Sequence, residues 1–177
     1  SAAWGVGKGT EIDVEDRVYF PHSLGIFYQA LTQYLGFPHY GDEYKVMGMA
    51  PYGEPLFVDK LHDVVTLSTD GLFKLNLQYF RKGTQGIITY NENHVPMVAP
   101  LFSELMIEKF GNPRKNKEEL NAYHKNLAAS VQRFTEEVIF HVLNHFHKQT
   151  GLTDVCIAGG VAQNSVANGK ITRNTPF

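Results

Sequence analysis

The sequence has one cysteine, no long apolar run and no large excess of either charge. Because Cys156 stands alone, the 177-residue chain can form no internal disulfide, and a reducing compartment is its expected environment. No apolar stretch approaches the roughly 18–20 residues of a membrane span, and there is no signal-peptide pattern. The net charge at pH 7 is −2 and the basic residues form no run, which argues against a nucleic-acid surface. These absences predict a soluble cytoplasmic domain that binds neither nucleic acid nor membrane.

What is present is the composition of a globular protein. Apolar residues make up 43% of the chain and charged residues 19%, which is unlike a disordered segment. A chain of 177 residues can bury one well-filled core, and this one has no internal repeat and no low-complexity tract. We therefore predict a single domain over residues 1–177.

Apolar periodicity and turn residues predict a mixture of strands and helices. Ser23 is a candidate N-cap, and Gly36 and Gly151 stand where glycines end helices. The expected strands cover residues 4–6, 14–20, 64–68, 72–77 and 155–158, with a short one near 86–90 inside an irregular loop over 81–99. The expected helices cover residues 24–35, 42–49, 55–63, 101–110 and 117–150, and a further helix opens after the adjacent glycines at 159 and 160.

Residues 154–170 carry the strongest chemical signal. A short apolar run reads as a buried strand and leads directly into Gly159 and Gly160. Two adjacent glycines allow a tight turn and let a phosphate approach backbone N–H groups, and a helix that starts just after them adds unpaired donors. The Asn164 side chain can donate into the same space. The segment matches neither the dinucleotide nor the P-loop fingerprint, so a strand–helix connection without a ligand is the alternative interpretation.

Three residues of the first third of the chain are further candidates. Lys45, on a short helix, is either a cation that neutralises phosphate or an ordinary solvated lysine. Tyr52 either packs against a base or ribose or is an ordinary core or surface tyrosine. His22 precedes a helix and is either a general base or substrate contact, or a histidine that hydrogen-bonds nearby backbone.

The long helix over 117–150 contains polar residues at helical spacing. His141 and His145 are separated by one turn, as metal ligands can be, but no third ligand is near, so a helix edge is the favoured interpretation. Gln132 and Glu136, also one turn apart, face either a cleft or water. Cys156, within an apolar run, is expected to be a buried structural thiol rather than a nucleophile.

Three segments, in this order, resemble the NodU/CmcH-type O-carbamoyltransferases: Pro21-His-Ser-Leu-Gly25, Gly41-Asp-Glu-Tyr-Lys-Val-Met-Gly-Met-Ala-Pro-Tyr-Gly-Glu-Pro55 and Gly159-Gly-Val-Ala-Gln-Asn164. The resemblance extends from about Trp4 to the end of the chain. The sequence departs from the usual residues of that family at Met49, Gln163 and Ser165. None of these changes removes a polar group that a site would need, so they affect substrate detail rather than family.

The resemblance implies a fold and an activity. The fold is an α/β lobe of the actin, Hsp70 and sugar-kinase type (ribonuclease H-like), with a mixed sheet and flanking helices. The activity uses ATP and carbamoyl phosphate to form carbamoyl-adenylate, and passes the carbamoyl group to a hydroxyl of a small natural product or sugar. A divalent metal and a YrdC-like domain are expected outside residues 1–177, in the same polypeptide. The chain is thus expected to be a partial ATP-binding lobe, inactive alone.

The resemblance also implies roles for individual residues. Gly159, Gly160, Val161 and Asn164 are expected to hold the phosphates of ATP. Lys45, Gly48 and Tyr52 are expected to flank the nucleotide from the other segment, with His22 as the catalytic candidate and no metal ligand within this chain. Two functions of other classes remain as alternatives: a non-catalytic nucleotide-binding module, and a small-molecule kinase lobe of the same superfamily.

Overall fold

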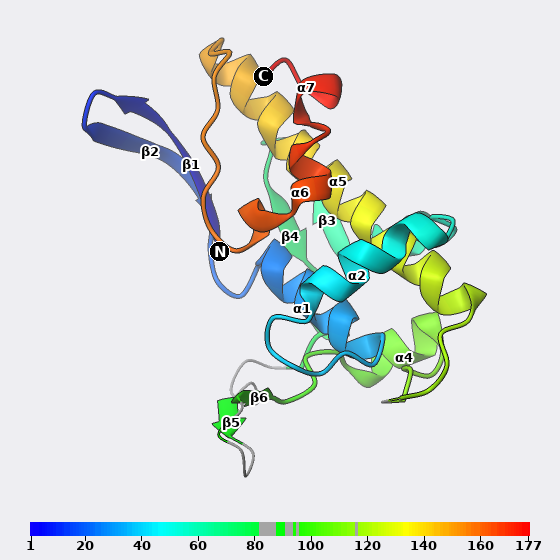
Figure 1. The fold of residues 1–177 in the computed structure, drawn as a ribbon. Helices are drawn as coiled ribbons and strands as arrows, with labels where there is room; N and C mark the ends of the chain where they lie inside the picture. Colours follow the sequence, from blue (N-terminus) through cyan, green and yellow to red (C-terminus); the bar gives the residue numbers. More distant parts are fainter. Residues whose placement is uncertain (82–87, 91–93, 95, 116) are drawn as a thin grey trace.

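The computed structural model describes residues 1–81, 88–90, 94, 96–115 and 117–177. Its helices pack around one long helix, α5 (Ala122–Thr150), which crosses the molecule from end to end (Figure 1). Around α5 lie the helices α1 (Leu24–Tyr34), α2 (Glu43–Met49), α3 (Val58–Leu61), α4 (Glu104–Phe110), α6 (Ser165–Asn168) and α7 (Ile171–Asn174). Short 3₁₀ turns are η1 (Ala50–Tyr52), η2 (Leu77–Tyr79) and η4 (Val161–Gln163).

The strands of the described residues form three separate two-stranded antiparallel sheets. They pair β1 (Ala2–Lys8) with β2 (Glu11–Val18), β3 (Val65–Leu67) with β4 (Phe73–Leu75), and β5 (Ile88–Tyr90) with β6 (Pro96–Val98). The fold is therefore mixed α/β with small sheets. The mixed sheet that the family resemblance implied does not form among these residues, because every ladder joins only two neighbouring, antiparallel strands.

Local signals in the sequence set most element boundaries. The Ser23 hydroxyl accepts a hydrogen bond from the Ile26 N–H at 3.5 Å and so caps α1, as predicted. Gly36, Gly71 and Gly151 adopt φ of +81°, +79° and +67°, a region that only glycine enters at little cost. The predicted end of α5 is thereby confirmed, and Gly71 forms the turn between the paired strands β3 and β4.

Three predicted helices are clearly shorter in the structure. The helix predicted over residues 55–63 is limited to Val58–Leu61, and the helix predicted over residues 101–110 begins at Glu104. The long helix begins at Ala122 rather than at residue 117. This later start of the long helix has a clear cause. The Asn121 side chain accepts from the His124 N–H at 3.2 Å and His124 Nδ1 accepts from the Asn121 N–H at 3.2 Å, a reciprocal cap that fixes the start. The predicted strand near 86–90 is present as β5 over Ile88–Tyr90, and residues 86–87 lie outside the described part of the chain.

The strand predicted over residues 155–158 is wrong. These residues form no ladder and are exposed, apart from the half-buried Val155, and Cys156 is exposed rather than buried. An extended segment becomes a strand only when a neighbour accepts its backbone hydrogen bonds, and no described strand lies in register with it. Within this run Val155 packs against the smaller buried cluster of Phe140, Leu143 and Ile171, whereas Cys156 and Ile157 are exposed.

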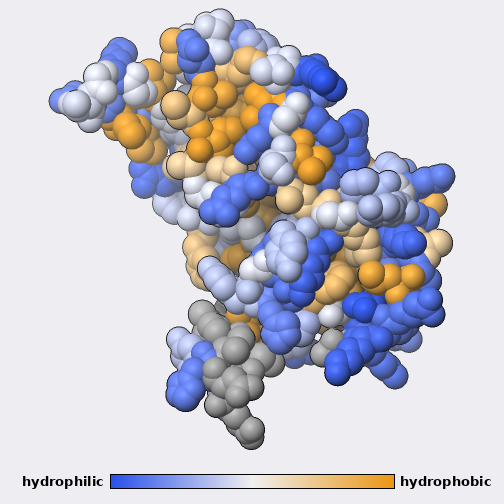
Figure 2. Space-filling view, in the orientation of Figure 1, coloured by the Kyte–Doolittle hydropathy of each residue, from blue (hydrophilic) through white to orange (hydrophobic). Residues whose placement is uncertain are grey.

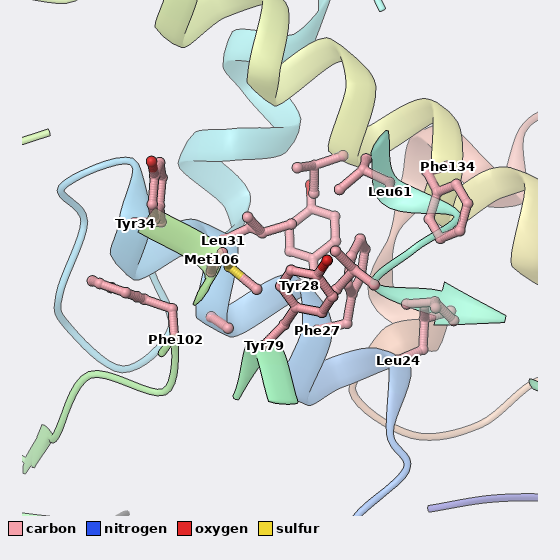
Figure 3. Packing of buried hydrophobic residues seen from close by; sticks show 14 of the residues in the cluster. Leu24, Phe27, Tyr28, Leu31, Tyr34, Leu61, Tyr79, Phe102, Met106 and Phe134 are labelled. Carbon is pink, nitrogen blue, oxygen red and sulfur yellow. The ribbon is translucent and has the colours of Figure 1, made fainter. Parts of the chain in front are cut away.

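The main hydrophobic core lies between α1 and α5. Phe27, Leu31, Leu61, Val65 and Phe134 are fully buried, and Figure 3 shows side chains of this cluster converging from both helices and from the neighbouring turns. Burial of side chains of this size contributes about 1.5–3 kcal/mol each relative to exposure. The core thus fixes α5 relative to α1 and α2. Among the described helices, none has the length and apolar character needed to cross a membrane.

Candidate functional site

The two longer motif segments meet beside α5. The Ser165 Oγ atom lies 3.8 Å from the Met47 Sδ atom, which joins α6 to α2. On the other side, Gly53 packs so closely on the Lys125 backbone that a Cβ atom would collide with it. Close packing of η1 on α5 thus requires glycine at position 53. The motif spanning residues 41–55 and the motif spanning 159–170 are brought together by their contacts with one helix.

A cleft of about 310 Å³ lies where α5 meets both segments. It is lined by Met47, Ala50, Pro51, Gly53 and Pro55 from the first segment, Ala129, Gln132, Arg133 and Glu136 from α5, and Val166 and Lys170 from the last segment. Its walls are mostly apolar, whereas its polar groups come from α5 and from Lys170. An apolar cleft with a few convergent polar groups is the usual form of a small-molecule site.

Three of the cleft-lining residues, Gln132, Glu136 and Lys170, belong to a chain of hydrogen bonds. The Tyr28 hydroxyl donates to Gln132 Oε1 at 3.0 Å, and the Asn164 Nδ2 atom donates to the same oxygen at 3.0 Å. Gln132 Nε2 donates to Asn164 Oδ1 at 3.1 Å and to Glu136 Oε1 at 3.0 Å. Lys170 Nζ then donates to both carboxylate oxygens of Glu136, at 2.7 and 2.8 Å. We call these five residues the buried network.

Two members of the network, Gln132 and Glu136, belong to α5 and are buried. Gln132 is 3% exposed and Glu136 is 1% exposed, while the Lys170 side chain is 42% exposed. Burial raises the pKa of the Tyr28 hydroxyl, and the charges of Glu43 and Glu136 raise it further, so this hydroxyl remains a donor. Of the two interpretations of Gln132 and Glu136, the structure therefore favours the cleft over water.

The Gly159–Gly160 turn is exposed and has free backbone donors. Gly159 adopts φ +105°, which requires glycine, whereas Gly160 is in the right-handed helical region at φ −61°. Within the described residues, no acceptor pairs with the N–H groups of Gly159, Gly160 or Val161. Three consecutive free N–H groups can bind an anion.

The helix predicted after these glycines is not a regular α-helix. The chain instead makes the three-residue turn η4 and then the four-residue helix α6, too short to provide a substantial dipole. Asn164 explains the break, because its Oδ1 atom accepts from the Ala167 N–H at 3.0 Å and caps α6. The Nδ2 atom of Asn164 also has a partner within the protein, because it donates to Gln132 Oε1.

The structure places Lys45, Gly48 and Tyr52 outside the cleft lining. Lys45 Nζ is 2.6 Å from Asp42 Oδ1 and lies above the Phe37 ring, and this hydrogen bond raises the pKa of Lys45. Tyr52 is 75% exposed, and Gly48 has open space around it. Gly48 and Tyr52 are direct chain neighbours of cleft-lining residues, but neither they nor Lys45 line the cleft.

The histidines have local partners. His22 Nδ1 accepts from the Leu75 N–H at 3.1 Å, which is the backbone interpretation of this residue. His141 Nε2 lies 2.9 Å from the Ser68 carbonyl oxygen, and His145 packs beside Gly71. In the described part of the chain no group of three His, Cys, Asp or Glu side chains has the arrangement of a metal site. His141 and His145 are helix-edge residues, as favoured from the sequence.

Sequence reasoning missed Tyr28, Arg133 and Lys170 as members of the cleft and network. Their signal is weak, because a tyrosine on an apolar helix face and isolated basic residues are common. A stronger signal was available for Gln132 and Glu136. Two polar residues one turn apart, beside the buried stripe of a long helix, are unusual unless they are paired.

Comparison with known proteins identifies the family. The family described as "Carbamoyltransferase N-terminus" has a model that matches residues 2–177, and the chain belongs to this family. The resemblance to NodU/CmcH-type carbamoyltransferases drawn from the motifs is thereby confirmed. The matched residues include the cleft, the buried network and the Gly159–Gly160 turn.

Three relatives show how far the similarity extends. The chain is 40% identical to the uncharacterized protein sll1178 of Synechocystis over 173 residues, 97% of this chain and 26% of that protein. It is 35% identical to nodulation protein NolO of Bradyrhizobium diazoefficiens over 97% of this chain and 27% of NolO. Identity to nodulation protein NolNO of Sinorhizobium fredii is 34%, over 97% of this chain and 22% of NolNO. The chain therefore spans about a quarter of the length of the curated relatives it matches.

Proposed function

We propose that this chain forms part of the ATP-binding unit of a carbamoyltransferase. The complete enzyme would transfer a carbamoyl group from carbamoyl phosphate, through carbamoyl-adenylate, to a hydroxyl of a small-molecule acceptor. Membership in the family described as "Carbamoyltransferase N-terminus" supports a carbamoyltransferase. We also take the chain to be part of a lobe of the actin, Hsp70 and sugar-kinase type, as the family resemblance implies.

The observation that carries the proposal is the turn at Gly159–Val161. Its three consecutive N–H groups have no acceptor among the described residues, and the turn leads through η4 into α6, where Val166 lines the cleft. A buried turn with free donors would be costly, whereas an exposed one is available to the oxygens of a phosphate. The apolar cleft walls contributed by residues 47–55 are suited to the base or ribose of the same ligand.

The chemistry assigned to these residues is positioning and charge stabilisation. Backbone N–H groups that have no acceptor within the described residues need not break a hydrogen bond when negative charge develops on a phosphate oxygen. In the proposed reaction Lys45 would act at longer range, since Asp42 already pairs with its ammonium group. His22 has Nε2 as its available atom, because Nδ1 accepts from Leu75. The described residues offer no metal ligand set, so no step is assigned to a metal.

The test uses the complete gene product that carries these residues. ATP binding is measured by calorimetric titration, and catalysis is measured as release of AMP and pyrophosphate that depends on carbamoyl phosphate. Gly160→Val should weaken ATP binding at least about tenfold, because a branched side chain would cover the free N–H groups. The fold should be retained, since Gly160 has φ −61° and open space around it.

Gly7→Val is the matched control. Gly7 lies in the exposed hairpin, and an added Cβ atom would meet only ordinary contact at 3.9 Å from the Glu11 carbonyl oxygen. This variant should bind ATP as the wild type does. If the wild type binds no ATP, the proposed function is wrong. ATP binding without turnover that depends on carbamoyl phosphate would instead indicate a non-catalytic nucleotide-binding module.

A further inference from the structure

Gln132 has every hydrogen-bonding position filled. Its Oε1 atom accepts from Tyr28 and Asn164, and its Nε2 atom donates to Asn164 and Glu136. A glutamine amide has two donor hydrogens and two acceptor positions, so this side chain has no capacity left for a ligand. Its rotamer and amide orientation are therefore fixed by the protein alone.

The two residues at the ends of the network keep one donor each. Asn164 Nδ2 has two hydrogens, of which one is used on Gln132 within the described contacts. Lys170 Nζ has three hydrogens and gives two to Glu136. Asn164 is half-buried and Lys170 is also partly accessible, so their remaining hydrogens can reach a ligand. Gln132, whose hydrogen-bonding positions are filled, and Glu136 thus hold Asn164 and Lys170, each of which has one N–H left to donate.

The charges around the cleft favour an anion. Glu136 contributes the one carboxylate among the cleft-lining residues, and both of its oxygens are occupied by Lys170. Arg133 also lines the cleft, and among the described contacts its guanidinium group forms no ion pair. Two cations and one neutralised carboxylate leave an excess of positive charge at the rim.

We infer that Gln132 and Glu136 are positioning residues that hold the Asn164 amide and the Lys170 ammonium group as paired donors to a phosphate oxygen of the bound nucleotide. This inference rests on the proposed function, which supplies the nucleotide. The backbone donors of Gly159–Val161 and the side-chain donors of Asn164 and Lys170 all lie within one stretch of 12 residues that packs on α5. Fixing Lys170 through a buried carboxylate removes most of the rotational freedom that a free lysine would lose on binding.

The alternative role for these residues is purely structural. A Lys170–Glu136 pair that only ties α6 and α7 to α5 would affect stability and not ligand affinity. The two roles separate when affinity for ATP and thermal stability are measured on the same variants. Because Glu136 acts through Lys170, the effects on ATP affinity of changing both should be no larger than the effect of changing Lys170 alone.

The experiment titrates ATP into the complete gene product and into Lys170→Met, Glu136→Gln and the double variant. Lys170→Met should raise the dissociation constant for ATP at least about tenfold, as expected when a hydrogen bond to a charged group is lost. Glu136→Gln should raise it by a smaller factor, and the double variant should match Lys170→Met. Lys109→Met is the control for loss of a lysine ion pair, because Lys109 pairs with the more exposed Asp63 and does not line the cleft.

Lys170→Arg serves if Lys170→Met fails to fold. The guanidinium group keeps the charge and the pairing with Glu136 but moves the donor, so ATP affinity should still fall. Unchanged ATP affinity in the folded Lys170 variants, with Gly160→Val defective, would overturn this inference and leave the proposed function standing. If the wild type binds no ATP, both are wrong. Additive effects of Glu136→Gln and Lys170→Met would also contradict the positioning role.

Discussion

The helical core and the segment that carries the adjacent glycines are built in opposite ways. In the core, α1 and α5 bring fully buried residues such as Phe27, Leu31 and Phe134 into contact (Figure 3). In residues 151–160, by contrast, every residue except the half-buried Val155 is exposed. Figure 2 shows hydrophobic residues gathered on the face between hairpin β1–β2 and the end of α5, where this segment runs.

The candidate site combines residues from both regions. Gln132 and Glu136 are held by the packed core, so their hydrogen-bond partners are fixed before any ligand arrives. The Gly159–Gly160 turn belongs to the exposed segment, where backbone donors can stay unpaired at little cost because water satisfies them. A ligand at this site would meet free backbone donors on one side and, on the other, the Asn164 and Lys170 side chains that Gln132 and Glu136 hold in place.

Hydrophobic burial in the exposed segment is limited to Val155, which packs against the smaller cluster of Phe140, Leu143 and Ile171. Leu152 is 46% exposed and Ile157 is 41% exposed, so these apolar side chains contribute little to folding energy. The turn is instead fixed by the φ of Gly159 and by the anchoring of Asn164 to Gln132. Variants in the core and in the turn should therefore differ in what they disturb.

The largest effect on stability is expected from the core. Phe134→Ala removes a fully buried ring that packs on Phe27, at 5.6 Å between ring centroids, and on His62 at 4.9 Å. The free energy of unfolding should fall by about 3–5 kcal/mol, measured by urea denaturation. Phe20→Ala, at a side chain that is 69% exposed, should change it by less than about 0.5 kcal/mol. Equal effects of the two variants would contradict the assignment of stability to the helical core.

The turn should respond to backbone conformation rather than to burial. Gly159→Ala places a Cβ atom at φ +105° and should cost about 1–2 kcal/mol of folding free energy. Gly160→Ala, at φ −61° with open space around it, should change it by less than about 0.5 kcal/mol. Thermal denaturation of the two variants beside the wild type measures this difference. Similar stability losses in both would mean that the two glycines do not have the different roles that the structure gives them.

The smallest effect concerns the start of α5 and depends on pH. Burial lowers the pKa of His124, and its Nδ1 atom accepts from the Asn121 N–H, so the neutral form is favoured in the folded state. The unfolded chain then binds the proton more readily. This contribution to stability is therefore fully present above about pH 6.5, the usual pKa of a histidine in the unfolded chain. It is lost as the pH falls from there through the lowered pKa of His124 in the folded protein.

The His124 contribution should amount to about 1 kcal/mol, the usual net value of one hydrogen bond. Stability is measured between pH 7.5 and 5 for the wild type and for His124→Gln. The glutamine variant keeps an acceptor for the cap and does not titrate, so its stability should decline less on acidification. A parallel decline in both proteins would show that other groups account for the loss.

Local sequence signals predicted most of the helices and the turns between them. Ser23, Gly36 and Gly151 act within their own element through capping and φ, so their effects can be anticipated without a fold. The motifs also predicted the family correctly. The site was predicted less completely. Lys45 and Tyr52 were chosen because they belong to the motif over residues 41–55, but the fold shows that other residues of this motif line the cleft.

The sequence by itself determined the caps, the glycine turns, the apolar face of α5 and the family to which the chain belongs. The tertiary structure alone decided that Gln132 meets Asn164, 32 residues away, and that Lys170 reaches Glu136 across 34 residues. It also decided that residues 155–158 are not a strand among the described residues. The physical reason is the same in each case. A cap or a left-handed glycine depends on its immediate neighbours, whereas a buried hydrogen bond or a strand depends on which distant segment packs beside it.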